Sequence, residues 1–252
     1  MIKMENISVE YGNTEVLHNI SVEFPAGKLT VLVGPNGCGK STLLKTLIHL
    51  KEYTSGEIFV EGHSIRDLDT NILAQKVAYL PQGKKAPDIT VRRMVLHGRF
   101  AYLKYPRRYR KIDYEMAEKA MKWVGIEHLA EQNVNQLSGG MQQKVYIAML
   151  LAQDTTTILM DEPTTYLDIQ YQIKLMDMAK ELVAQGKAVV MVLHDISQAF
   201  RNADYIVVMD GGRIKDCGTP EEIYQKKTVD EVFQIQLNRV FTEIGYQYFS
   251  TI

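Results

Sequence analysis

A glycine-rich segment with the sequence GPNGCGKS runs from Gly34 to Ser41, and its residue types are suited to binding phosphate groups. Its spacing matches the pattern GxxxxGK[ST]. Glycines let successive backbone N–H groups point inward around an anion, and a helix N-terminus adds partial positive charge. The segment predicts a nucleoside triphosphate site, in which Lys40 reaches the β- and γ-phosphates and Ser41 ligates Mg²⁺. The predicted contacts are Gly34, Asn36, Gly37, Cys38, Gly39, Lys40, Ser41 and Thr42.

Two adjacent carboxylates, Asp161 and Glu162, follow the apolar run Ile158–Met160. An acidic pair after a strand is by itself more often the solvated start of a helix. At the carboxyl edge of a parallel sheet, however, such acids lie where ligands bind. Beside the phosphate loop, we expect Asp161 to hold the Mg²⁺ shell and Glu162 to polarise an attacking water.

A second helix start suited to anions lies at Ser138, within the sequence LSGGM. Apolar residues recur at helical spacing through Gln142–Ala152, so Ser138, Gly139 and Gly140 are expected to form the N-terminus of that helix. The chain thus offers two anion-binding helix starts, of which only the first carries a lysine loop.

Taken together, GPNGCGKST, LSGGM, ILMDEP and His194 resemble the ATP-binding cassette family, the nucleotide-hydrolysing subunits of transporters. The resemblance covers nearly the whole chain. It implies that Tyr11 stacks on adenine, that Gln82 senses Mg²⁺ and the transport subunit, and that His194 acts as the γ-phosphate switch. It also implies a nucleotide-site role for Asp168, in the segment after the acids.

The chain departs from the family pattern around its second helix start. The usual LSGGQ reads LSGGM here, and Met141-Gln-Gln-Lys144 replaces the common Gln-Arg-Gln-Arg. Ser138 and Gly140 are kept, so the resemblance still implies a phosphate contact. The contribution of the missing glutamine and arginines to a dimer interface is left open. Tyr166-Leu-Asp168 also lacks the common Ser-Ala before Leu-Asp.

The elements that must position these residues follow from hydrophobic periodicity. Strand-like alternation predicts a β-rich N-terminal layer over 2–9, 15–24 and 28–33, followed by the glycine loop and a helix over 41–50. Short apolar runs at 156–160, 188–193 and 205–209 alternate with helical stretches at 169–184 and 196–202. This alternation favours a mostly parallel sheet covered by helices, and 236–252 is expected to form a last hairpin.

The middle of the chain, 89–153, loses the strand pattern and predicts an inserted helical subdomain, with one helix running to Val124 and stopped by Gly125. The prediction is an α/β fold in one domain, 1–252. It has a P-loop NTPase core (1–88 and 154–252), an N-terminal antiparallel β layer and the helical insertion with the signature sequence.

Composition narrows the class of protein. The 252 residues carry 29 Lys and Arg against 30 Asp and Glu, a net charge of −1, which excludes a strongly basic nucleic-acid footprint. Two cysteines are too few for a disulfide scaffold, and we expect a reducing, cytosolic compartment with neither secretion nor a membrane span. Because Cys38 lies in the phosphate loop, its thiol is predicted to be more reactive than that of Cys217, and its alkylation is predicted to block ATP binding.

One local cluster of cations stands out at Arg107, Arg108, Arg110 and Lys111, interleaved with Tyr105 and Tyr109. Such a cluster is compatible with RNA or anionic lipid. Because the net charge of the chain is −1, a solvated loop is favoured over nucleic-acid binding. Docking toward a membrane partner ranks between these two interpretations.

The segments VLHGRFAYLKYPRR and DEPTTYLDIQYQIKLMDMAKEL most resemble the importer branch for iron chelates, haem or cobalamin. This resemblance implies an ATPase that uses ATP and Mg²⁺ and forms a homodimer on two membrane-spanning permease subunits, at the cytoplasmic face of the membrane. An extracytoplasmic binding protein would deliver the cargo, and no nucleic acid would be bound. The alternatives are a soluble cassette ATPase in a non-transport role such as iron–sulfur cluster assembly, a non-hydrolysing nucleotide-binding scaffold and, least favoured, a small-molecule kinase.

Overall fold

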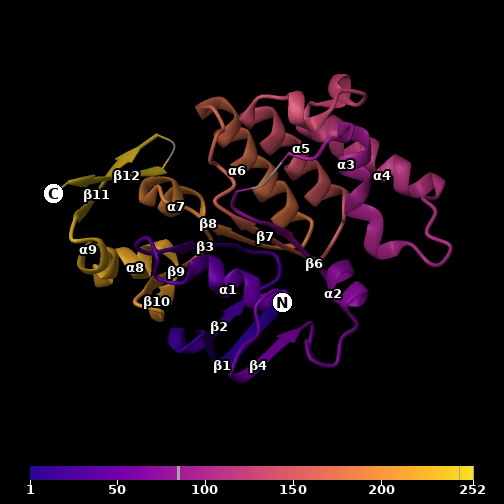
Figure 1. Ribbon diagram of the computed structural model, residues 1–252. Coiled ribbons are helices and arrows are strands. Elements are labelled where there is room, and N and C mark those ends of the chain that lie inside the picture. Colours follow the sequence, from indigo (N-terminus) through magenta and orange to yellow (C-terminus); the bar gives the residue numbers. More distant parts are fainter. Residues whose placement is uncertain (84–85, 244, 252) are drawn as a thin grey trace.

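The centre of the molecule is a six-stranded sheet, described here from a computed structural model covering residues 1–83, 86–243 and 245–251 (Figure 1). All adjacent strands pair in parallel except the last, β10, which pairs antiparallel with β9. The predicted mostly parallel sheet is therefore confirmed. In spatial order the strands are β10 (Arg213–Gly218), β9 (Tyr205–Asp210), β3 (Leu29–Val33), β8 (Ala188–Val192), β7 (Thr157–Asp161) and β6 (Val77–Leu80).

Alternate residues of these strands supply two separate hydrophobic cores. On one face, Leu32 and Val190 pack with helix α1 (Lys40–Leu47) and the N-terminal strands. On the other, Val31 and Val189 pack with helices α6 and α7. Because both faces are covered, β3, β7 and β8 are buried along their whole length and read as continuous apolar runs. Helix α6 spans Ile169–Ala184 and α7 spans Ile196–Asn202, as the periodicity predicts.

The predicted antiparallel N-terminal layer is confirmed as a four-stranded sheet, but its membership differs from the prediction. The run 28–33, expected in this layer, instead forms the buried central strand β3, while strands at 55–60 and 63–64, which the sequence did not predict, complete the layer. The layer lies against α1 at the lower side of the view in Figure 1. Short helix α2 (Thr70–Lys76) connects this layer to β6 and is capped by the Asp69 side chain. In spatial order the strands are β2 (Thr14–Phe24), β1 (Ile2–Tyr11), β4 (Ser55–Val60) and β5 (His63–Ser64).

Between β6 and β7 the described residues form helices, as the sequence predicts. The 14-residue helix α4 ends at Val124, and Gly125 follows with a φ of +79°, a conformation that glycine adopts without steric cost. The division into core and helical subdomain stays a prediction. The helices are α3 (Val91–Leu96), η1 (His97–Tyr102), α4 (Lys111–Val124), η2 (Glu127–Leu129), η3 (Val134–Gln136) and α5 (Gly139–Ala152).

The C-terminal part contains two short helices and the predicted hairpin. Tyr248 fixes the hairpin to the body through ring contacts of 5.1 Å with Phe200 and 5.8 Å with Tyr224. Among the described residues, no helix combines the length and the apolar character needed to cross a bilayer. The elements are α8 (Pro220–Lys226), α9 (Thr228–Phe233), β11 (Gln236–Thr242) and β12 (Gly245–Thr251).

Candidate nucleotide site

The glycine loop connects β3 to the N-terminus of α1, as predicted, and it is packed closely against neighbouring backbone. Gly37 and Gly39 adopt φ values of +78° and +103°, which suit glycine. A Cβ on Gly34 would lie 2.2 Å from the carbonyl oxygen of Met209 on β9. The Gly212 N–H also donates to the Cys38 carbonyl at 3.2 Å. Loop geometry and neighbouring strands together require glycine at these positions.

Lys40 holds its ammonium group inside this loop. Its side chain is buried, and Nζ donates to the carbonyl oxygens of Gly34 at 2.7 Å and Pro35 at 2.9 Å. A buried ammonium at the N-terminus of α1 concentrates positive charge where an anion would lie.

The loop forms one wall of an open cavity of about 360 Å³. Residues from the ends of β6, β7 and β8 form the opposite wall, although they are far from the loop in sequence. Val16, on β2, also lines the cavity. The sequence does not predict this position, because nothing distinguishes Val16 from other strand valines. The lining is Val16, Asn36, Gly37, Gly39, Lys40, Ser41, Thr42, Gln82, Glu162 and His194.

Asp161 is the buried member of the acid pair, 1% exposed at the end of β7. Burial raises the pKa of its carboxyl group; a hydrogen bond with Ser41 acts in the opposite direction, and the charge of Glu162 adds to the rise. The Tyr79 hydroxyl donates to Oδ2 at 3.4 Å, whereas Oδ1 has no hydrogen-bond partner within the described part of the chain. A carboxylate oxygen and a hydroxyl beside a phosphate loop suit Mg²⁺, which prefers oxygen ligands.

Glu162 occupies the neighbouring position at the cavity and is held by two polar side chains. Gln82 Nε2 donates to Oε2 at 2.7 Å, and His194 Nε2 lies 2.5 Å from Oε1. The Glu162 backbone has a φ of +50°, a left-handed conformation that is costly for a non-glycine residue and is most often found at functional sites. The structure therefore brings Glu162, the acid predicted to polarise water, together with Gln82 and His194, to which the resemblance gave roles at the nucleotide.

Several predicted site residues lie outside the cavity lining, among them Gly34, Cys38, Asp161, Tyr11 and Asp168. Tyr11 is half exposed at the end of β1, and Lys51 Nζ lies 3.9 Å from its ring centroid. Asp168 caps the N-terminus of α6, where its carboxylate accepts from the Tyr171 N–H at 2.8 Å. For Asp168 the structure gives a helix-capping role, and the predicted nucleotide roles of Tyr11 and Asp168 stay predictions.

Ser138 caps α5, as predicted, and its hydroxyl accepts from the Met141 N–H at 3.4 Å. Neither Ser138 nor Gly139 or Gly140 lines the cavity that holds Lys40. Within one chain the two anion-binding helix starts are therefore separate.

Gln143, which matches the family pattern, and Lys144, which departs from it, both make contacts within the chain. Gln143 Nε2 donates to the Pro163 carbonyl at 2.9 Å, directly after the acid pair. Lys144 Nζ lies 4.0 Å from the ring centroid of Tyr171, a cation–π contact. These side chains connect α5 to the segment that follows β7, so they contribute to the position of Glu162.

The predicted reactivity of Cys38 is wrong. Its side chain is 5% exposed, and burial raises the pKa of the thiol, an effect that the nearby Lys40 charge only partly offsets. The sulfur accepts from Lys40 Nζ at 3.7 Å, but it belongs to the apolar cluster that also contains Leu43 and Leu44, and burial outweighs the nearby charge.

We therefore expect the half-buried Cys217 to react with iodoacetamide about tenfold faster than Cys38 in the folded chain. Mass spectrometry over a labelling time course measures both rates, and the denatured chain, in which both thiols are open, is the control. Faster labelling of Cys38 would contradict the burial argument.

Comparisons with known proteins agree with this geometry. The ABC transporter family model matches residues 17–165, more than half of the chain. The petrobactin import ATP-binding protein FpuD of Bacillus anthracis is 40% identical, with 93% of this chain and 87% of that protein covered. The ferric enterobactin transport ATP-binding protein FepC of Escherichia coli K12 is also 40% identical, at 93% and 88% coverage.

Among solved structures, a dimeric ATP-binding cassette in a post-hydrolysis state with ADP and Pi superposes with a TM-score of 0.78. It is 30% identical, and the match covers 87% of this chain and 99% of that one. The fold and family predicted from the motifs are confirmed, and this chain belongs to the ABC transporter family.

Proposed function

We propose that this chain is the ATP-hydrolysing subunit of a membrane importer for an iron chelate. The observation that carries the proposal is the single cavity that combines a buried lysine in a phosphate loop with Glu162 and its two polar partners. Relatives named for import of petrobactin and ferric enterobactin at 40% identity support the cargo class. Such a subunit works at the cytoplasmic face of the membrane, as a peripheral protein.

In this mechanism the loop N–H groups and Lys40 bind the β- and γ-phosphates of ATP. Ser41 and Asp161, with Gln82 at the edge of the cavity, would hold Mg²⁺, which neutralises phosphate charge when bound. Glu162 orients the attacking water and accepts its proton, and His194 keeps the Glu162 carboxylate aimed into the cavity. These roles are proposed from where the side chains lie, how far they are buried and which chemical groups they carry.

The functional unit in this proposal is a head-to-tail pair of chains on two permease subunits. The separation of Ser138 from Lys40 within one chain supports it, because each helix start at Ser138 is then available to the ATP of the partner. Two-fold symmetry makes both ATP sites equivalent. An extracytoplasmic binding protein would act through the permease and not touch this chain.

The alternative, a soluble cassette ATPase in iron–sulfur cluster assembly, finds no support among the relatives, which include import and transport ATP-binding proteins. A non-hydrolysing scaffold is disfavoured by the Glu162 cluster.

Transport of the cargo tests the proposal directly. In a strain that lacks the gene for this chain, uptake of a radiolabelled ferric siderophore should fall to background and be restored by the wild-type chain but not by Glu162→Gln. Uptake of haem and cobalamin in the same strain controls for cargo class. Unchanged siderophore uptake in the deletion strain would refute the iron-chelate assignment.

A further inference from the structure

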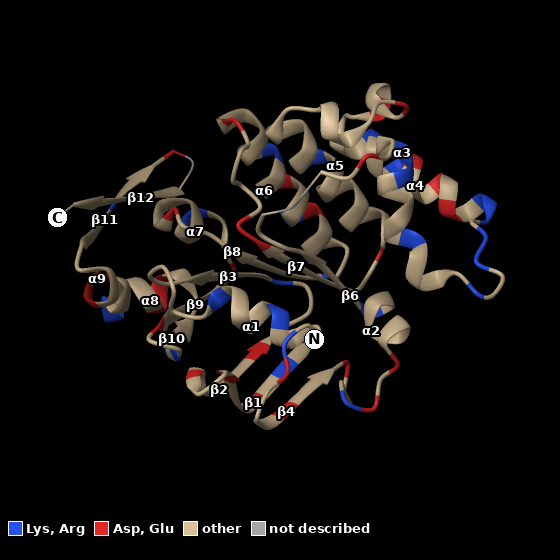
Figure 2. Ribbon diagram, viewed as in Figure 1, with Lys and Arg blue, Asp and Glu red and all other residues tan. Residues whose placement is uncertain are grey.

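An exposed basic loop connects η1 to α4 and has no role in the proposed ATP site. Its eight residues, Lys104–Lys111, have the sequence KYPRRYRK, with five cations and no acid. Figure 2 shows this loop as a blue segment at the N-terminal end of α4, at the outer edge of the molecule. The net charge of the chain is only −1, so this concentration of positive charge is local.

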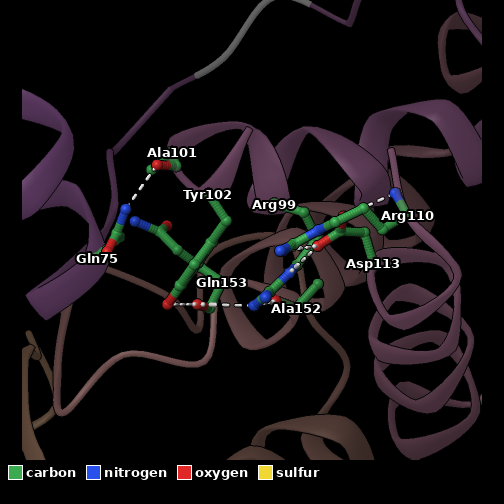
Figure 3. Close-up of polar contacts among 8 residues, drawn as sticks. All are labelled: Gln75, Arg99, Ala101, Tyr102, Arg110, Asp113, Ala152 and Gln153. Carbon is green, nitrogen blue, oxygen red and sulfur yellow. Dashed lines mark hydrogen bonds and ion pairs between the residues drawn. The ribbon is translucent and has the colours of Figure 1, made fainter. Parts of the chain in front are cut away.

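Two ion pairs that share one buried carboxylate fix the base of this loop (Figure 3). Asp113 is fully buried and accepts from Arg99 Nε at 3.2 Å and from Arg110 Nε at 3.1 Å. Burial works to raise the pKa of Asp113, but the hydrogen bonds from Arg110 and Arg99 outweigh it and hold the pKa below its usual value. Since one carboxylate serves two guanidinium groups, the cluster keeps a net positive charge at the base of the loop.

The same cluster connects η1, at the base of the loop, to the end of α5 and to α2, and the Gln153 side chain reaches β6 by donating to the Val77 carbonyl at 3.4 Å. Arg99 Nη1 and the Tyr102 hydroxyl both donate to the Gln153 carbonyl, at 3.3 and 2.8 Å. The Gln153 side chain in turn donates to the carbonyl of Ala74 in α2, and Gln75 Nε2 donates to Ala101 at 2.7 Å (Figure 3). These contacts hold the loop in a defined direction relative to α2 and β6.

The outward side of the loop combines cations with exposed rings. Tyr105 is 97% exposed and Phe100 is 44% exposed, and the Arg107 guanidinium lies 4.5 Å from the Phe100 ring centroid. Within the described ranges, Lys104, Arg107 and Arg108 form no ion pair, whereas Arg110 and Lys111 pair with Asp113 and Glu115. Three cations beside an almost completely exposed tyrosine are thus available to an external partner.

We propose that the loop Lys104–Lys111 contacts anionic lipid headgroups at the membrane surface. Unpaired Lys and Arg side chains near a bilayer are attracted by the negative potential of acidic lipids. Tyrosine favours the same interfacial zone, with its ring toward the acyl region and its hydroxyl in water. The fixed base lowers the ordering cost of binding. The inference uses the peripheral membrane location proposed above, but its test requires neither permease nor transport.

Vesicle binding by the full chain tests this contact. The chain should co-sediment with vesicles of phosphatidylcholine containing about one third phosphatidylglycerol, and not with pure phosphatidylcholine, at roughly 0.1 M salt. The triple variant Lys104→Gln/Arg107→Gln/Arg108→Gln should bind the anionic vesicles at least about tenfold more weakly. A matched control removes the same charge elsewhere through Lys28→Gln/Lys122→Gln/Lys180→Gln, three exposed lysines, and should bind like the wild type.

Tyr105→Ser separates insertion of the ring from attraction of charge, and should weaken vesicle binding by a few fold without changing its salt dependence. ATP hydrolysis in solution should be the same in all these variants, because none of the substituted residues lines the nucleotide cavity. If the wild-type chain does not hydrolyse ATP, this result contradicts the proposed function and leaves the proposed lipid contact unaffected.

Two results would overturn the lipid contact. One is equal vesicle binding by the wild type and the triple loop variant. The other is a wild type that does not bind anionic vesicles, combined with a triple loop variant that no longer co-purifies with a co-expressed permease. The loop would then bind protein and not lipid.

Discussion

Lys40→Ala is expected to weaken Mg-ATP binding by about 10- to 100-fold. The substitution removes the side-chain charge that the proposed mechanism places at the β- and γ-phosphates, and a hydrogen bond to a charged group contributes about 1.5–3 kcal/mol. The backbone N–H groups of the loop remain, so residual affinity should persist. Isothermal titration of the purified chain with Mg-ATP measures the loss.

Two controls make this titration specific. Lys28→Ala removes an exposed lysine outside the nucleotide cavity and should leave the affinity unchanged. Thermal unfolding of Lys40→Ala checks the fold, because Nζ also donates to the carbonyls of Gly34 and Pro35. A folded variant with wild-type affinity would mean that Lys40 does not contact the nucleotide.

Glu162→Gln should slow ATP hydrolysis by about 10²- to 10⁴-fold, the usual range for loss of a general base. The amide keeps the size of the side chain, so phosphate contacts from the loop should remain. ATP would then persist at the interface and stabilise the pair of chains by linkage, since it binds the dimer more tightly than the monomer. A colourimetric phosphate assay measures the rate, and analytical ultracentrifugation measures the shift from monomer to dimer.

A second substitution tests whether Ser138 lies in the proposed dimer interface. Adding Ser138→Arg to Glu162→Gln places a large side chain at the helix start proposed to contact the ATP of the partner. The double variant should stay monomeric with saturating Mg-ATP while still binding nucleotide. Equal dimerisation of the single and double variants would exclude Ser138 from the interface, and a monomeric single variant would exclude ATP-driven pairing of the isolated subunit.

Much of the fold is predictable from local patterns because its central strands are buried on both faces. Such strands read as continuous apolar runs, and the predicted helices at Ile169–Ala184 and Ile196–Asn202 match the structure in full. Strand β6 and helix α2 escape prediction, because Val77–Leu80 is only four residues long and α2 buries only Leu73, so neither shows a hydrophobic period.

For the site, motifs locate the phosphate loop and the acid pair, but they do not give the contacts between distant strand ends. That Gln82 and His194 both bind Glu162 depends on the spatial order of β6, β7 and β8, which no single segment encodes. The Cys38 prediction failed for a related reason, since motif position does not say whether a side chain faces the anion or the core.

The close packing of the glycine loop has a kinetic consequence. With Gly34 close to the Met209 carbonyl and Cys38 hydrogen-bonded to Gly212, neighbouring strands fix the shape of the loop. A receptor that needs no rearrangement binds at a rate set by diffusion and orientation, and it loses little chain entropy on binding. Differences in nucleotide affinity between variants of this loop should then appear in the rate of dissociation and not in the rate of association.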